Sequence, residues 1–479
     1  MTGTELTALL PLIGVAGTSI VLMAAIAIKR DRRWTIAITL VGLAVSLGLV
    51  FVARRIVPCD LTPLLRIDGF ALFFFALLIS ATAVVALLAY EYLDRRNTVP
   101  DEFYLLLLLA TLGGCVLAAS THFASLFLGL EILSVSLYGL VAYLRRSELC
   151  LEAGVKYLIL AAVSSAFMLF GMALVYARTG SMVFADLANL RLSEGAGPAA
   201  ITVTGLALMM VGVGFKLALA PFHMWTADVY EGAPAPVTAY VATVSKAAVI
   251  ALLLRLLAAA APPAPQLVWF MALIAGASIV IGNLLALRQD NLKRLLAYSS
   301  IAHLGYLMVA VIAGGANGGE AAAFYLAAYV PTSLIAFGVI TVLSSADRDC
   351  DLVDDVVGLG GRRPVLAGLL AVALLSLAGI PLTAGFVGKF LVLGAGVGTG
   401  QWTLALILVL GSVISIFYYL RVIVAMYMRE APETTPAEAG PRVPATVAAT
   451  LAALLAVLLW LGVWPGPFLE IVHRTVGAL

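Results

Sequence analysis

The chain has 479 residues, of which 63% are hydrophobic and only 11% are charged, and its mean hydropathy of +1.09 exceeds what a soluble domain tolerates. A formal net charge of +2, with no basic run interleaved with aromatic residues, excludes a nucleic-acid surface. The sequence therefore predicts an integral membrane protein whose surroundings are membrane lipids.

Apolar runs of about 20 residues, the length that crosses a bilayer, recur along the whole chain and predict about fourteen transmembrane helices. These runs fall at 5–28, 34–53, 68–90, 103–120, 122–144, 154–177, 200–220, 236–259, 266–287, 296–313, 320–345, 364–394, 402–428 and 444–464. The first run has neither a basic leader nor a small-residue cleavage site, so we expect a retained span. The expected fold class is an all-α polytopic membrane protein.

The loops carry an independent signal, because cytoplasmic loops of membrane proteins are enriched in lysine and arginine. If the loop after the first span is cytoplasmic, the loops on that side carry Lys29, Arg30, Arg32, Arg33, Arg95, Arg96, Arg145, Arg146, Arg288, Lys293, Arg294, Arg348, Arg362, Arg363, Arg429 and Arg442. The opposite loops carry only Arg54, Arg55, Arg66, Arg178, Arg191 and Arg474. This bias supports the predicted spans and places both termini on the exterior side of the membrane.

The cysteines and glycines match no cofactor motif. Cys59, Cys115, Cys150 and Cys350 stand far apart without a C-x-x-C pair, which argues against an iron–sulfur or zinc site. The alternating glycines of 394–400 do not match G-x-G-x-x-G, so we interpret them as a flexible connection. We expect the chain itself to bind no cofactor and no metal.

A faint internal repeat links two parts of the chain. A Tyr-Leu pair, two hydroxyl residues and a helix-breaking proline occur at Tyr157, Leu158, Ser164, Ser165 and Pro221, and again at Tyr325, Leu326, Thr332, Ser333 and Pro381. An odd number of predicted spans separates the members of each pair. The second copy is therefore expected to be inverted in the membrane, as in transporters that build two half-pathways.

Two charged residues fall within the predicted spans at 122–144 and 154–177. Glu131 is too far from either end of its span to snorkel, and a lone charge there costs about 2.5–3.5 kcal/mol on the mild insertion scale. We expect Glu131 either to be protonated or to pair with a lysine, and a neutral structural glutamate is the alternative. Lys156 lies just inside its span near Glu152, where it either relays protons or reaches the interface.

The segment from Gly212 to Lys246 places lysines in apolar sequence and interrupts the helical pattern at Pro221. Proline frees carbonyl groups one turn earlier, and exposed backbone at this depth is tolerated only where it lines protein or water. The sequence therefore predicts a hydrated pocket with Lys216 at its edge. Because neighbouring charges change each other's proton affinity, a change at Glu131 is expected to switch Lys216 between holding and releasing a proton. A static ion pair is the alternative for either lysine.

Titratable and hydroxyl side chains lie near these lysines in the sequence. Imidazole accepts and donates protons near neutral pH, so His223 and His303 either bridge lysines through water or are satisfied core histidines. Tyr298 either adds a hydroxyl to the same path or anchors the helix at the interface. Asp228 and Glu231 follow the break, where they form an acidic entrance, cap the next helix or bind a partner's basic residues.

Lys389 follows the second interruption, at Pro381. The inverted repeat places it in the second half-pathway, nearer the exterior. A lysine that snorkels at a helix end is the alternative, because 395–401 has the composition of a loop.

Four strings closely resemble one family: GLEILSVSLYGLVAYLRR, GVGFKLALAPFHMWTADVYEGAPAPVTAYVATVSKAA, DNLKRLLAYSSIAHLGY and AGIPLTAGFVGKF. This is the subunit N family of bacterial proton-pumping NADH:quinone oxidoreductase (respiratory complex I), within the Mrp-antiporter-like superfamily. The resemblance covers about residues 100–430 and implies a fourteen-helix fold with two inverted five-helix repeats, each with a broken helix. The implied domains are three N-terminal helices at 1–102, a first repeat at 103–259, a second repeat at 260–428 and a C-terminal helix at 429–479.

The resemblance also implies site residues. The family's charged positions in the fifth, broken seventh, eighth and broken twelfth helices match Glu131, Lys216, Lys246 and Lys389, and positions that it associates with the channel match His223 and Tyr298. His303 and Lys156 stay relay candidates on the residue arguments above.

In this family the subunit carries no redox centre, and NADH, FMN, iron–sulfur clusters and quinone act in partner subunits. The resemblance implies a proton-translocating subunit of this translocase in the bacterial inner membrane, coupled to quinone reduction elsewhere. The implied partners are other membrane subunits of complex I, including a second antiporter-like subunit. An Mrp-type cation/proton antiporter subunit or an equivalent subunit of a membrane-bound hydrogenase is the alternative, and a scaffold whose charges only fix helix packing is a third.

Overall fold

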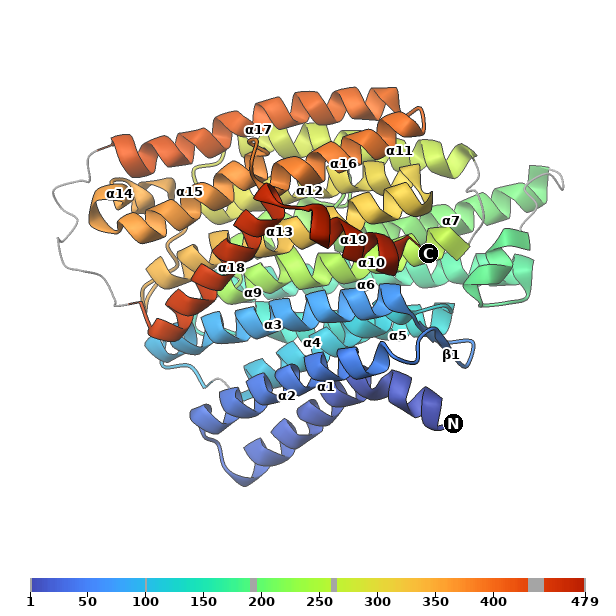
Figure 1. Ribbon diagram of the computed structural model, residues 1–479, viewed down its shortest axis with the longest axis horizontal. Helices are drawn as coiled ribbons and strands as arrows, with labels where there is room; N and C mark the ends of the chain where they lie inside the picture. The colour runs from blue at the N-terminus through green and yellow to red at the C-terminus, as the bar shows by residue number, and fades with distance from the viewer. Residues whose placement is uncertain (1, 100, 190–195, 260–264, 430–442, 478–479) are drawn as a thin grey trace.

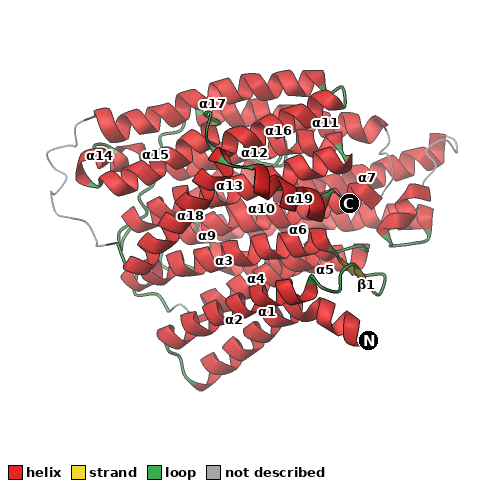
Figure 2. Ribbon diagram, in the orientation of Figure 1, coloured by secondary structure: helices red, strands yellow, loops and turns green. Residues whose placement is uncertain are grey.

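The computed structural model describes residues 2–99, 101–189, 196–259, 265–429 and 443–477, and nearly all of them are helical. Most helices run side by side along one direction, and loops connect them at the two ends of the bundle (Figures 1 and 2). The all-α polytopic fold predicted from the sequence is confirmed.

The elements in chain order are α1 (Gly3–Ile28), α2 (Arg32–Ala53), β1 (Cys59–Leu61), β2 (Leu65–Ile67), α3 (Gly69–Arg95), α4 (Asp101–Ala119), α5 (Phe123–Val141), α6 (Glu148–Thr179), η1 (Phe184–Asn189), α7 (Ala196–Leu217), α8 (Met224–Gly232), α9 (Ala235–Tyr240), η2 (Val241–Ser245), α10 (Lys246–Ala259), α11 (Pro265–Ala286), α12 (Leu292–Ala313), α13 (Gly315–Leu343), η3 (Val353–Val356), α14 (Leu359–Arg362), α15 (Pro364–Ala378), α16 (Ala384–Gly398), α17 (Trp402–Met428), α18 (Ala445–Val463) and α19 (Gly466–Val476). The segment η2 is a π-helical turn, whereas η1 and η3 are 3-10 helices. β1 and β2 form a small antiparallel hairpin in which Cys59 is paired with Ile67.

Within the described residues, 13 helical stretches are long and apolar enough to cross a membrane. One of them, Ala235–Ala259, joins α9, η2 and α10. The shorter helices α15 and α16 follow one another across a break, so together they make one further crossing, as predicted for 364–394. α16 continues to Gly398, so the prediction of a flexible connection at 394–400 is wrong. Glycine is common within transmembrane helices, and its presence here does not end the helix.

Loops predicted to be cytoplasmic meet at one end of the bundle. Arg96, which follows α3, and Lys293, at the start of α12, both bind Asp349 of the loop after α13, at 2.7 Å each. This agrees with the predicted alternation of the spans. Two arginines of the loop-charge argument, Arg191 and Arg442, lie outside the described residues, as does the predicted domain junction at 260.

The centre of the bundle is formed by α12 and α13. In the most apolar stretch of each of these helices 94% of the residues are buried, compared with 28% in α1, α2 and α18. Small residues allow α12 to approach α11 closely. A Cβ on Gly282 would lie 2.7 Å from the Ala302 nitrogen, and one on Gly305 would lie 2.9 Å from the Ala275 oxygen. The helix that carries His303 is therefore fixed by backbone contact on one side and buried on the others.

Candidate functional site

The first broken helix places a buried lysine just before its interruption. α7 ends at Leu217, Ala218 has a φ of +58°, and the helix resumes with α8 at Met224. Lys216 is 2% exposed, and its Nζ donates a hydrogen bond to the Tyr157 hydroxyl at 3.0 Å. The same Nζ lies 5.0 Å from the centre of the Tyr157 ring, a cation–π distance. The predicted pairing of a broken helix with a buried lysine is therefore seen here.

Glu131 lies on α5, half-buried, and accepts a hydrogen bond from the Ser165 hydroxyl of α6 at 2.7 Å. In the described part of the chain it forms no direct ion pair with Lys216, although the two charges interact through space. Tyr157 also interacts with the Glu131 carboxylate. The outer face of α5 beside Glu131 carries Leu128 and Val135, which are 60% and 59% exposed. The acid thus lies between the buried lysine and the edge of the subunit.

Lys246 is fully buried at the first residue of α10, directly after the π-helical turn η2. Such turns recur at functional sites because the extra residue redirects the side chains that follow. Its Nζ donates to the Ser300 hydroxyl of α12 at 2.7 Å, and the Tyr329 hydroxyl of α13 donates to the same Ser300 at 2.8 Å. The lysine is therefore connected to the two central helices.

His303 lies between the second and third lysines. Its Nδ1 is 2.5 Å from the Tyr325 hydroxyl and its Nε2 is 3.2 Å from the Tyr419 hydroxyl. The imidazole interacts electrostatically with both Lys246 and Lys389. A cavity of about 10 Å³ adjoins the ring, about the space that one water molecule needs. The histidine therefore has a hydroxyl on each ring nitrogen and room for one water beside it.

Lys389 lies on α16, after the second break, and is 6% exposed. Its Nζ donates to the carbonyl oxygen of Ala378 at 2.9 Å. Ala378 is the last residue of α15, where unpaired carbonyls favour a cation. Gly379 has a φ of +81°, and a Cβ there would lie 2.8 Å from the Lys389 Cδ. Burial and this contact rule out the snorkelling alternative for Lys389.

Three other predicted residues lie away from these contacts. His223 is 8% exposed at the N-cap of α8, and its Nδ1 has no hydrogen-bond partner among the described residues. Tyr298 is half-buried on α12, whereas the tyrosines that contact His303 directly are Tyr325 and Tyr419. Lys156 is 42% exposed and pairs with Glu152 at 2.6 Å and with Asp228 at 2.7 Å.

The acids after the first break are neutralised by basic side chains. Arg294 of α12 binds Asp228 at 2.9 Å and Glu231 at 2.7 Å. An entrance of unpaired carboxylates is therefore not what the structure contains. These ion pairs instead join α8 to the start of α12.

The residues that sequence reasoning missed are mostly hydroxyls that connect the charged groups: Tyr157, Ser165, Ser300, Tyr325, Tyr329 and Tyr419. The internal repeat contained a signal for three of them, because Tyr157, Ser165 and Tyr325 belong to the recurring motif. Arg255 of α10 is a further buried charge: it is 5% exposed and binds both carboxylate oxygens of Asp68 at 2.9 and 2.7 Å.

The described residues contain no group of three or more histidine, cysteine or acidic side chains placed to hold a metal ion. What they do contain is a series of buried amines, an imidazole and hydroxyls that runs from α5 and α6 through α10 and α12 to α16. Each of these groups can bind, donate or accept a proton or a hydrogen bond.

Known proteins share this sequence and architecture. The family described as NADH:quinone oxidoreductase/Mrp antiporter, TM, matches residues 120–415. NADH-quinone oxidoreductase subunit N of Ectopseudomonas mendocina (strain ymp) is 49% identical over 439 residues, which is 90% of this chain and 88% of that protein.

Solved structures agree. A chain of respiratory complex I from Thermus thermophilus with bound aureothin superposes with a TM-score of 0.82 at 37% identity, covering 96% of this chain and 98% of that one. A chain of the Mrp complex from Dietzia sp. has a TM-score of 0.86 at 22% identity, covering 100% and 98%, and shares the fold. The chain belongs to the NADH:quinone oxidoreductase/Mrp antiporter family of membrane proteins.

Proposed function

We propose that the chain is a proton-translocating membrane subunit of a bacterial NADH:quinone oxidoreductase. The observation that carries this is the series of buried proton-binding groups, Lys216, Lys246, His303 and Lys389, joined by hydroxyls and set beside two broken helices. The relative that is 49% identical bears the name of such a subunit. Isolated charges in a membrane interior are costly, so a set of them argues for ion transfer and against a packing role.

The proposed route enters from the cytoplasm near Lys246 and exchanges protons along the line that includes Lys216 and His303. It leaves to the exterior past Lys389. Ser300 touches Lys246, and Tyr325 touches His303, so hydroxyls lie where transfer between amine and imidazole needs them. His223 Nδ1 is a buried polar atom without a hydrogen-bond partner among the described residues. Water is the ordinary partner of such atoms, and we assign water to the remaining gaps in the route.

The energy has to come from partner subunits. Moving one charge against 100 mV costs about 2.3 kcal/mol, and no fuel-binding motif is found in this sequence. We assign NADH, FMN, iron–sulfur clusters and quinone to the partners, which include other membrane subunits and a second antiporter-like one. Glu131, near the outer face of α5, would receive the electrostatic signal from a neighbour and pass it to Lys216.

The proposed domains follow the two breaks. Residues 103–259 and 260–428 would be inverted five-helix repeats, with 1–102 and 429–479 as flanking helices. We place both termini on the exterior side of the inner membrane because of the loop charges. A periplasmic reporter fused after 477 should be active, whereas one inserted near Arg145 should not be.

Replacement of Lys216 tests the proposal. The assembled complex is compared in inverted membrane vesicles, where NADH oxidation and acidification of the lumen are recorded together. We expect Lys216→Ala to lower both rates at least tenfold, about 1.4 kcal/mol, and Lys29→Ala, at a loop lysine whose side chain is 73% exposed, to leave both nearly unchanged. Wild-type pumping by Lys216→Ala would overturn the proposal.

The second candidate is an Mrp-type cation/proton antiporter subunit. The Mrp chain from Dietzia sp. supports this through the fold alone, at 22% identity. Vesicles that contain the complex should take up ²²Na⁺ without NADH if the antiporter assignment is correct. If sodium uptake stays at background level while NADH drives acidification of the lumen, the result supports the proposed function and excludes the antiporter assignment.

A further inference from the structure

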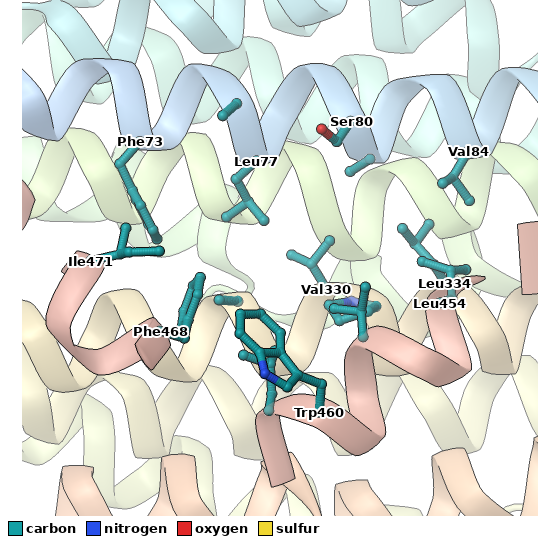
Figure 3. A pocket seen from close by; sticks show the side chains of 16 residues that line it. Phe73, Leu77, Ser80, Val84, Val330, Leu334, Leu454, Trp460, Phe468 and Ile471 are labelled. Atoms are coloured by element: carbon teal, nitrogen blue, oxygen red, sulfur yellow. The ribbon is translucent and has the colours of Figure 1, made fainter. Parts of the chain in front are cut away.

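An apolar groove of about 360 Å³ opens between α3, α13, α18 and α19, away from the buried charges (Figure 3). Phe73, Ser80 and Val84 line it along α3, with Trp460 of α18 and Phe468 of α19 across from them. Apart from the Ser80 hydroxyl and the Trp460 indole nitrogen, every lining side chain is apolar. Nothing along the groove would hold a charged or strongly polar ligand.

The groove is open along one side. α18 runs obliquely to α3 (Figure 1), and the groove lies between these two helices, α13 and α19. Val457 and Ile471 at its edge are 44% and 48% exposed, and Ser80 is also exposed. Because α3, α13 and α18 cross the membrane, this opening faces hydrocarbon and not water.

The dimensions of the groove select its occupant. From Phe73 to Val84 the lining of α3 extends about 16 Å at 1.5 Å per residue, close to one leaflet of a hydrocarbon core about 30 Å thick. A transmembrane helix of a partner occupies on the order of 2,500 Å³ and cannot enter. We infer that the groove binds one acyl chain of a membrane phospholipid.

The end of the groove near α19 suits the headgroup. Phe468 and Ile471 lie at this end. The last turn of α19 carries His473 and Arg474, whose side chains are 72% and 67% exposed and pair with Glu320 and Glu470. Exposed ion pairs are weak, so a lipid phosphate competes with these carboxylates for the two basic side chains. The phosphodiester therefore lies against α19, with the chain directed toward Val84.

The bound chain supports the contact between α18 and the second break. Gly462, near the end of α18, packs so closely on this break that a Cβ there would lie 2.5 Å from the Leu382 oxygen. An acyl chain fills the space on the other side of α18 and holds the helix in this position. Removal of the chain leaves the packing of α18 incomplete on that side.

The test uses a phospholipid with a photoreactive diazirine in one acyl chain, exchanged into the purified whole complex. After detergent washing that removes freely exchanging lipid, the complex is irradiated and labelled peptides are identified by mass spectrometry. We expect retained label in 69–95 and 445–476 at several times the level found on the exposed face of α11. Ser80→Trp, at an exposed position that fills the groove, should lower this label at least fivefold.

The matched control is Leu273→Trp, which places the same side chain on the exposed face of α11, 71% exposed, and should change the label less than twofold. Equal labelling of α3 and α11, or label on a partner subunit that covers the groove, would overturn the inference. Displacement of the label by excess quinone would also overturn it, because the occupant would then be an isoprenoid chain. Normal NADH oxidation by Ser80→Trp shows that the variant has assembled.

Discussion

The two broken helices hold their lysines differently. In the first, Lys216 precedes the break and donates to the Tyr157 hydroxyl, with the Glu131 carboxylate acting from nearby. In the second, Lys389 follows the break and donates to the Ala378 carbonyl. A hydroxyl both accepts and donates protons, whereas a carbonyl only accepts hydrogen bonds. The first site is therefore suited to receiving a signal and passing a proton, and the second to holding a cation until it leaves.

Loss of the carboxylate should have the largest effect, because the first site uses an acid, whereas the described residues place none against Lys389. Glu131→Gln keeps the shape and the hydrogen bond from Ser165 but removes the charge. Coupling energies of 1–3 kcal/mol predict a loss of about tenfold or more in NADH-driven proton pumping. Glu131→Asp, the charge-preserving control, should retain most of the rate. If Glu131→Gln pumped protons at the wild-type rate, the proposed difference between the two broken-helix sites would be wrong.

The tyrosine beside Lys216 should come next. Tyr157→Phe leaves a buried amine without its hydrogen-bond partner, which costs about 1–3 kcal/mol, and we expect pumping to fall about fivefold. Tyr325→Phe should lower the pumping rate only about twofold, because water in the cavity beside His303 can replace the hydroxyl. Tyr104→Phe, at a buried tyrosine of α4 away from the lysines, is the control. Equal losses in all three would indicate packing and not proton transfer.

At the second break the backbone, and not a side chain, positions the lysine. Gly379→Ala places a Cβ against Lys389 at a φ of +81°, which costs about 1–3 kcal/mol of strain. Pumping should fall about threefold while assembly is retained. Gly368→Ala, in the middle of α15 with open space around its Cβ position, should be neutral or slightly stabilising. If the two variants behaved alike, the carbonyl contact of Lys389 would not matter.

The sequence predicts the architecture well because apolar runs and proline breaks are local properties. The spans and the two interruptions follow from composition alone, and the depth of Glu131, Lys216, Lys246 and Lys389 within their runs marks them as unusual. The hydroxyl partners are not local. Ser300 contacts Lys246 across 54 positions of the chain, and Tyr419 contacts His303 across 116.

The π-helical turn before Lys246 was also invisible to pattern reasoning. Such a turn has no composition signal of its own, and VATVS reads as an ordinary apolar helix. The burial of Asp349 is likewise not a local property. It lies in the charged run 347–355, whose composition is that of a solvated loop, yet it is nearly buried, because Lys293 and Arg96 reach it from other elements.

Substitution of Asp349 should have the smallest effect on proton pumping, since this residue lies outside both broken helices. Burial raises the pKa of its carboxyl, but Lys293 and Arg96 outweigh this, and the pKa lies below the usual 3.8. A depressed folded-state pKa stabilises the fold above the unfolded-state value, and the contribution is lost only as pH falls through the folded-state value. At about pH 5 to 8 this contribution is therefore complete and constant.

Asp349→Asn should lower the free energy of unfolding by about 1–3 kcal/mol, because Lys293 keeps two backbone carbonyl partners at 2.7 Å. Thermal unfolding of the purified complex should show the same deficit throughout this pH range, with pumping per NADH unchanged. Asp351 of the same loop is the matched control. Burial raises the pKa of its carboxyl, so the folded state favours its charge less, and Asp351→Asn should lower the free energy of unfolding by a smaller amount. A deficit that shrank between pH 8 and 6 would mean that the ion pairs of this loop titrate in the working range. The charges at the edge of the membrane would then belong to the proton path and not only to the frame that holds it.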